Sequence, residues 1–187
     1  MFLILLNIII KSLKFDQKLY TDKKYFSATA IYFSSTIILI TSLISIIPNN
    51  YFLKYMGDMV GSIDSPRLIS VVFSGFLTWL IKSGYLYIFG TLVFPSKLTQ
   101  KKFKKTLIVV GYAHAPFILN FLVLDINLLF IIVVSYLWYS ATLVVGINYL
   151  YQYNNYFKSI LLVMGPIIIL IIFTLIQLSS IPIGTLS

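Results

Sequence analysis

Five long runs of apolar residues constrain this chain more than any other feature of its sequence. A helix needs about 20 apolar residues to cross the hydrocarbon core of a bilayer. The runs cover approximately residues 26–47, 68–93, 107–124, 128–150 and 160–181. Water cannot bond to backbone groups at that depth, so the spanning structure must be helical or a closed barrel. The runs lack the alternating polarity of barrel strands. We therefore predict an all-α integral membrane protein with five transmembrane helices.

The composition and the breaks between the runs support this prediction. Hydrophobic residues make up 59% of the chain and charged residues 10%, whereas soluble domains carry about 25% charged residues. Little of the 187-residue chain remains outside the runs, so we predict one membrane domain over residues 1–187. The third and fourth runs are joined only by Asp125-Ile126-Asn127. This short connection predicts a tight antiparallel hairpin, with Asp125 as a loop residue.

The distribution of basic residues predicts the orientation of the helices. Five lysines precede the first run, five lie between the second and third, and one lies between the fourth and fifth. The other side of the predicted membrane holds only Lys54 and Arg67. Because Lys and Arg gather on cytoplasmic loops, we predict a cytoplasmic N-terminus and an outside C-terminus. The same rule explains the formal net charge of +9 without a nucleic-acid partner.

The first 25 residues form a cytoplasmic or interfacial segment in this prediction. Residues 1–13 are apolar but too few to span a bilayer. Lys11, Lys14 and Lys18 recur at helical spacing, which is typical of a helix lying in the headgroup layer. A signal peptide is the alternative, but no basic residue precedes the apolar run.

Two ionisable side chains, Lys82 and His114, fall inside predicted spans. A charge at that depth costs about 2.5–3.5 kcal/mol on insertion scales, so such residues are functional candidates. Lys82 either contacts a ligand or ion, or is satisfied within the bundle or by snorkelling. His114 either makes a structural hydrogen bond across helices or takes part in a proton relay. Pro116 follows closely, and it frees a backbone carbonyl one turn earlier because proline has no amide hydrogen.

The chain lacks the residue sets of familiar catalytic and metal sites. It contains no cysteine and no glutamate, and His114 is its single histidine. A metal site needs several converging ligands, and a Ser-His-Asp triad needs a carboxylate beside the histidine. We therefore predict no enzymatic activity, no metal and no cofactor, although composition leaves a quinone or polyisoprenoid site open.

A lysine-rich segment separates the second and third runs. Its members are Lys97, Lys101, Lys102, Lys104 and Lys105. Each cation near an anionic leaflet is worth about 1 kcal/mol, so we predict a contact with acidic lipid headgroups or an acidic partner. The alternative is a topology signal without further function.

The sequence from residue 107 to residue 158 carries a recognisable pattern. Gly111-Tyr112-Ala113-His114-Ala115-Pro116 is followed by the short hairpin, by Trp138 in the fourth run and by Lys158-Ser159. This pattern resembles the membrane domain of the Yip family, the Ypt/Rab-interacting proteins. The resemblance implies five helices, a cytoplasmic N-terminus and a small non-enzymatic membrane protein concerned with membrane organisation or assembly.

The sequence also departs from that family. Pro95 and the lysine-rich segment stand where prokaryotic relatives often have a Gly-Gly pair. The soluble N-terminal region through which eukaryotic relatives engage Rab GTPases is missing from this sequence, so Rab binding is not implied.

Two functions follow as predictions. The first is a structural or accessory subunit that contacts the lipid bilayer and other membrane proteins or itself. The alternative is a small oligomeric channel or carrier that uses Lys82 and His114. A lipid-modifying enzyme is a third option, for which the sequence supplies few acid–base groups.

Overall fold

The computed structural model describes residues 2–47, 65–93, 103–123, 130–153 and 155–179, and these residues form helices without a β-strand. The elements are α1 (Phe2–Leu13), α2 (Lys18–Thr21), the 3-10 helix η1 (Lys23–Phe26), α3 (Ala30–Ile44), α5 (Ser65–Leu92), α6 (Phe103–Ala113), the 3-10 helix η2 (Ala115–Leu122), α7 (Phe130–Tyr151) and α8 (Tyr156–Ser179). The predicted all-helical fold is confirmed.

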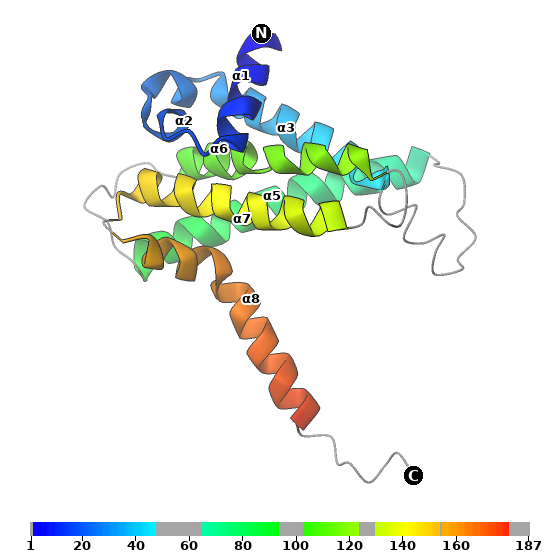
Figure 1. Cartoon of the computed structure of the whole chain (residues 1–187), viewed down its shortest axis with the longest axis vertical. Coiled ribbons are helices and arrows are strands. Elements are labelled where there is room, and N and C mark those ends of the chain that lie inside the picture. Colours follow the sequence, from blue (N-terminus) through cyan, green and yellow to red (C-terminus); the bar gives the residue numbers. More distant parts are fainter. Residues whose placement is uncertain (1, 48–64, 94–102, 124–129, 154, 180–187) are drawn as a thin grey trace.

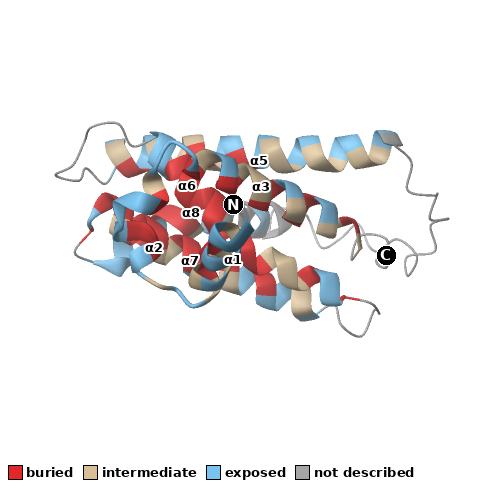
Figure 2. Ribbon diagram, turned by 90° about the horizontal axis from the view of Figure 1, so that it is seen from above, coloured by how far each residue is buried: buried red, intermediate tan, exposed pale blue. Residues whose placement is uncertain are grey.

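A bundle of α3, α5, α6 with η2, and α7 forms the body of the molecule, and successive helices run in opposite directions (Figure 1). Helix α6 is at its centre, where it packs against α3, α5 and α7. Every residue from Thr106 to Ala113 is buried, as the red ribbon of α6 in Figure 2 shows. The first half of the segment predicted as the third span is therefore enclosed by the other helices, whereas Phe121 and Leu122 near its end are exposed.

Three helices of the described chain are long and apolar enough to cross a membrane, and they cover Pro66–Leu92, Phe103–Leu122 and Phe130–Tyr151. Helix α3 has 15 residues and a length of about 22 Å, which is shorter than the hydrocarbon core of about 30 Å. It begins at Ala30 and not near residue 26, because the 3-10 turn of η1 and a Ser27–Thr29 hydroxyl contact of 2.9 Å come first. Five spans remain a prediction.

The third span differs from its predicted form in two ways. Helix α6 begins at Phe103, so Lys104 and Lys105 lie in its first turn and not in a loop. The α-helix also ends at Ala113, and the 3-10 helix η2 continues the segment after His114. The cause is Pro116, which has no amide hydrogen to donate to the carbonyl of residue 112. The predicted hairpin at residues 125–127 lies outside the described residues.

Small residues let the central helices approach closely. A Cβ at Gly111 of α6 would come within 2.5 Å of Ser34 Cβ and 3.0 Å of Ser34 Cα on α3. The Ser34 hydroxyl also donates to the carbonyl of Ile108 across this contact, at 3.2 Å. Helices in a membrane associate through close packing and interhelical hydrogen bonds. Burying apolar side chains between helices adds no hydrophobic stabilisation there, because lipid tails are also apolar.

The hydrogen bonds between α5, α6 and α7 gather in one half of the bundle. Trp79 Nε1 donates to the carbonyl of Leu107 at 2.8 Å, and the Tyr153 hydroxyl donates to the carbonyl of Gly90 at 2.8 Å. The hydroxyls of Thr106 and Tyr151 lie 3.0 Å apart. We call this half the basic end, because Lys105 at the start of α6 and Lys158 at the start of α8 lie there.

Residues 2–26 form a structure that we call the N-terminal hook, and α1 crosses the bundle helices instead of running along them (Figure 1). The hook is attached at the middle of the bundle. The Ser12 hydroxyl donates to the buried carbonyl of Tyr112 at 2.7 Å, and Trp138 Nε1 donates to the carbonyl of Leu13 at 3.1 Å. The carbonyl that Pro116 frees is thus occupied by a serine 100 residues earlier in the chain.

Helix α1 stops where Phe15 takes a left-handed conformation, with φ 53°. Such a residue commonly ends a helix, but an aromatic residue there is unusual. Its ring stacks on Trp138 with a centroid separation of 6.1 Å, and this contact accounts for its presence. The predicted short N-terminal helix is present over Phe2–Leu13. Lys14 and Lys18 fall outside it, so it does not extend over the three lysines as their spacing implied. The interfacial position of α1 remains a prediction.

An ion pair closes the turn after α1. Lys11 Nζ lies 3.0 Å from Asp16 Oδ2, and the Lys18 backbone amide donates to Asp16 Oδ1 at 2.9 Å. The hydrogen bond to Lys11 and the one from Lys18 hold the pKa of the Asp16 carboxyl below its usual range. The same pair raises the pKa of Lys11. The pair is therefore charged at neutral pH. Its stabilisation is lost as the pH falls through the lowered pKa of Asp16 or rises through the raised pKa of Lys11.

Helix α8 starts against α7 and α5 and then turns away from the bundle (Figure 1). Pro166 lies within it, after Gly165. An internal proline removes one helical hydrogen bond and bends the helix, as the Gly-Pro pair predicts. Helix α8 is not among the three spans identified above, so its predicted crossing of the membrane is untested.

Replacing Gly111 by alanine should destabilise the bundle by about 1–3 kcal/mol, because the new methyl group overlaps the backbone of α3. Gly84→Ala is the matched control, since a Cβ at Gly84 meets nothing within 4 Å. That control should be neutral or stabilising by up to about 1 kcal/mol, because alanine favours helix. Thermal unfolding of the two purified proteins in one detergent measures the difference. Equal midpoints would show that the α3–α6 contact is not tight.

Candidate functional site

The two ionisable residues predicted at membrane depth converge on one aromatic ring. Lys82 Nζ lies 4.3 Å from the ring centroid of Tyr139 on α7. The imidazole of His114 lies 4.7 Å from the same ring, centroid to centroid. The Tyr139 side chain is buried, with 2% exposure. A cation over the face of a tyrosine ring is attracted by the ring's quadrupole, so the bundle supplies an internal partner for Lys82.

Helix α5 carries Lys82 without interruption. Ser83 and Gly84 follow it, and α5 nevertheless runs continuously from Ser65 to Leu92. The lysine is half-buried. Its place in the bundle therefore comes from the packing of α5 beside α6 and α7 and not from a local break in the helix.

His114 stands at the junction of α6 and η2. Its backbone amide bonds to the carbonyl of Gly111 at 3.2 Å, and its Nδ1 lies 2.7 Å from the carbonyl oxygen of Val110. A carbonyl only accepts, so Nδ1 carries the proton, and in the neutral ring Nε2 is then an acceptor. The partner of Nδ1 lies one turn earlier in the same segment and not on another helix.

An aromatic cluster continues from His114 along η2 and α7. Phe117 lies 4.9 Å from Tyr136 and 5.0 Å from Tyr139, measured between ring centroids. The Tyr139 hydroxyl and the nearby Ser135 hydroxyl on α7 are buried and have no hydrogen-bond partner among the described residues. Polar groups that are buried and unpartnered are costly, and the hydroxyls of Tyr20 and Ser83 are two more of them elsewhere in the described chain.

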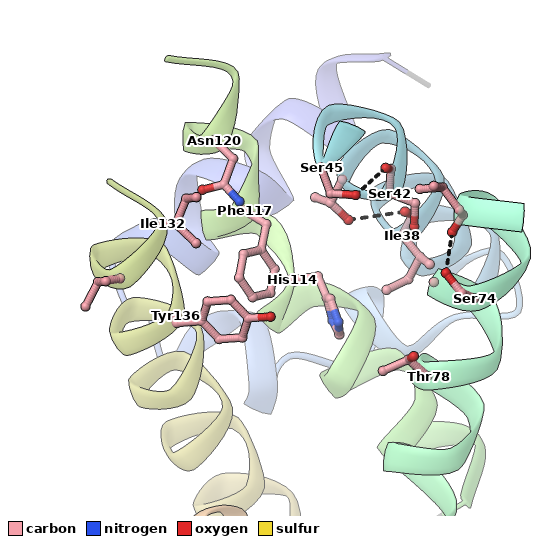
Figure 3. A pocket seen from close by; sticks show the side chains of 14 residues that line it. Ile38, Ser42, Ser45, Ser74, Thr78, His114, Phe117, Asn120, Ile132 and Tyr136 are labelled. Atoms are coloured by element: carbon pink, nitrogen blue, oxygen red, sulfur yellow. Dashed lines mark hydrogen bonds between the residues drawn. The ribbon is translucent and has the colours of Figure 1, made fainter. Parts of the chain in front are cut away.

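A pocket of about 610 Å³ lies beside this cluster, in the half of the bundle away from the basic end. It is lined by α3, α5, η2 and α7, and by His114. Figure 3 shows Phe117 and Tyr136 on one side of the pocket and Ser42, Ser45, Ser74 and Thr78 on the other, with His114 between them. Its volume is within the range of small-molecule sites.

The described lining of the pocket has no Asp, Glu, Lys or Arg. Within the described chain there is also no group of three His, Cys, Asp or Glu residues that could hold a metal ion. The described aspartates, Asp16 and Asp22, both belong to the N-terminal hook. The pocket's own side chains can bind through hydrogen bonds and apolar contact, but they offer no carboxylate to act with His114.

The lysine-rich segment is described only in part. Lys104 and Lys105 are exposed on the first turn of α6, and Lys105 Nζ lies 5.9 Å from the ring centroid of Phe26. Lys97, Lys101 and Lys102 lie outside the described residues, as does Asp125. Among the described residues of this segment, Lys105 contacts the ring of Phe26 and not Lys82 or His114.

We did not predict from the sequence that Tyr139, Asn120 and the hydroxyl side chains of the pocket belong to the site. A signal for the hydroxyls exists: Ser74, Thr78 and Lys82 recur every four residues, which places them on one face of a helix. Thr41 and Ser45 have the same spacing in α3. Polar side chains at helical spacing in an apolar run indicate an internal polar face.

Comparison with known families adds one finding. The model of the Yip1 domain family matches residues 6–177. No curated protein and no solved structure matches the chain. The family match confirms the resemblance derived from residues 107–158 and extends it over the earlier helices.

The hydrogen bond at His114 predicts the tautomer of its ring. Because the chain has one histidine, its imidazole ¹⁵N resonances need no assignment between residues. We expect the neutral ring to show a protonated Nδ1 and an unprotonated Nε2 in the protein reconstituted in lipid. A protonated Nε2 would contradict the bond to Val110.

Proposed function

Because the chain belongs to the Yip1 domain family, we propose that this membrane protein is non-enzymatic and acts as a structural or accessory subunit. Its partners are other membrane proteins or further copies of itself, and its role lies in membrane organisation or assembly. We propose no Rab partner, because Rab binding is not implied by this sequence.

The observation that carries this proposal is the outer part of α8. Ile168, Ile169 and Ile172 follow the internal proline and are 43%, 68% and 52% exposed. The bundle does not cover them, although the first part of α8 packs on α7. A bent apolar helix that leaves its own bundle presents a surface for lipid or for a neighbouring subunit.

The use of polar groups inside the bundle also supports a non-enzymatic role. The Tyr112 hydroxyl donates to the carbonyl of Tyr25 at 3.0 Å, and Trp79, Tyr153 and Ser34 bond to carbonyls of neighbouring helices. These groups hold segments together. Acid–base catalysis instead needs titratable groups directed at a substrate.

A cysteine placed on α8 tests the accessory role. The chain has no cysteine, so Ile169→Cys gives one thiol for cross-linking in native membranes. Leu137→Cys on α7 is the matched control, since Leu137 and Ile169 are 66% and 68% exposed. We expect a discrete cross-linked protein from Ile169→Cys and little from Leu137→Cys, followed by co-purification in mild detergent. A monomer without cross-links at both positions would contradict the proposal.

The orientation of the helices belongs to the same proposal. Lys23, Lys24, Lys105 and Lys158 belong to elements that meet at the basic end, which supports placing that end in the cytoplasm. Lys97, Lys101, Lys102 and Lys104 would join them in contact with acidic headgroups or an acidic partner. A reporter fused after residue 187 should be found outside, and a cytoplasmic reporter would overturn the arrangement.

A channel or carrier is the second candidate function, favoured by the approach of Lys82 and His114 to Tyr139. In this case the protein would form an oligomer and pass an anion by way of Lys82. Liposomes containing the protein should then show anion flux that Lys82→Met abolishes and Lys158→Met leaves intact. Flux that survives Lys82→Met would reject this mechanism.

A further inference from the structure

The pocket at the end of the bundle opposite the basic end has buried residues in one part of its lining and exposed residues, which we call its rim, in another. Its lining includes Thr41 and Asn120, each 5% exposed, and Ser42, which is 8% exposed. Ser74 and Thr78 of α5 and Tyr136 of α7 are exposed at its rim. The rim belongs to two helices that are long and apolar enough to cross a membrane, so a molecule from the bilayer can reach the pocket.

The polar groups of the pocket are rich in free acceptors. The hydroxyls of Thr41, Ser45 and Ser74 already donate to backbone carbonyls of Ile37, Ser42 and Val71, at 2.9, 2.6 and 2.9 Å. Their oxygen lone pairs are left to accept. His114 adds Nε2 as a further acceptor in its neutral form, because its Nδ1 donates to Val110.

The side chain of Asn120 contains a hydrogen-bond acceptor that lacks a donor in the described chain. Its side-chain oxygen Oδ1 is buried and has no hydrogen-bond donor among the described residues. A buried carbonyl oxygen without a donor is destabilising. Asn120 lines the pocket, and a half-turn of its amide, which keeps the shape of the group, would present this oxygen to a ligand that brings a donor.

The described lining of the pocket favours an uncharged donor over a cationic one. An ammonium ligand would bring hydrogens, but the described lining has no carboxylate to receive it. Lys82 follows Thr78 by one helical turn on α5 and lies near the same His114–Tyr139 pair. A second cation would be repelled by it. Hydroxyl groups are donors that carry no charge.

The apolar side chains of the lining can contact the hydrocarbon part of an amphiphile. Ile38, Ile132 and Val133 line the pocket together with the rings of Phe117 and Tyr136. Aromatic faces suit the C–H surface of a polyol, and aliphatic side chains suit a hydrocarbon chain. From the acceptors, the orphaned oxygen of Asn120 and the absence of charge in the described lining, we infer that the pocket binds the uncharged, hydroxyl-bearing headgroup of a membrane amphiphile.

Retention of neutral lipids tests this site. The probes are glycerol monooleate, which has two free hydroxyls, and methyl oleate, which has the same chain and none. Native mass spectrometry of the full-length protein counts bound molecules during titration. We expect saturable retention of glycerol monooleate and not of methyl oleate. Asn120→Leu should weaken retention about fivefold or more, as expected for one lost hydrogen bond.

Two further variants separate binding from folding. Ser74→Leu fills the exposed rim without entering the core and should also reduce retention. Ser135→Ala is the matched control, because Ser135 is a buried, unpartnered hydroxyl on α7 that does not line the pocket. This control should retain glycerol monooleate like the unmodified protein.

The alternative outcomes are distinct. Displacement of the lipid by free glycerol or inositol would support the same hydroxyl recognition and identify a soluble polyol as the source. Equal retention of methyl oleate, unaffected by Asn120→Leu, would overturn the inference in favour of non-specific lipid contact. Stronger retention of dioleoylphosphatidate that is lost in Lys82→Met would overturn it in favour of an anion site. None of these results depends on whether the protein is an accessory subunit.

Discussion

Pro116 has no amide hydrogen, and this single chemical fact organises the centre of the molecule. The carbonyl of Tyr112 loses its helical donor, and the Ser12 hydroxyl occupies it at 2.7 Å. The backbone tightens into a 3-10 helix at the same place, so the carbonyl of Val110 is left for the His114 side chain. The break therefore attaches the N-terminal hook and also fixes which nitrogen of His114 is left as an acceptor.

The two halves of the bundle differ because polar residues are used differently on either side of this break. Toward the basic end, Trp79, Tyr151 and Tyr153 donate to carbonyls of α5 and α6. Beyond the break, the hydroxyls of α3 and α5 bond within their own helices. Bonds within one helix do not pull helices together, and a pocket remains between them. The hydrogen-bonded half positions the helices, and the half with the pocket offers a binding surface.

The sequence predicted the features that depend on local chemistry. Long apolar runs predicted the helices, and Pro116 predicted the freed carbonyl. Features that depend on distant contacts were not predicted. Nothing near Ser12 in the chain indicates Tyr112 as its partner, and nothing near Lys82 indicates Tyr139. The start of α6 at Phe103 was missed because Lys104 and Lys105 read as a loop in a hydropathy pattern.

The attachment of the hook through the freed carbonyl is tested most directly by amide hydrogen exchange in Ser12→Ala. Loss of this hydroxyl leaves the buried Tyr112 carbonyl without its donor, and exchange across residues 2–26 should accelerate about fivefold or more. Thr21→Ala removes only an exposed hydroxyl that bonds locally to Gln17, and exchange elsewhere in the hook should not change. Unchanged exchange in Ser12→Ala would contradict the account, because the hook would then be held without the carbonyl that Pro116 frees.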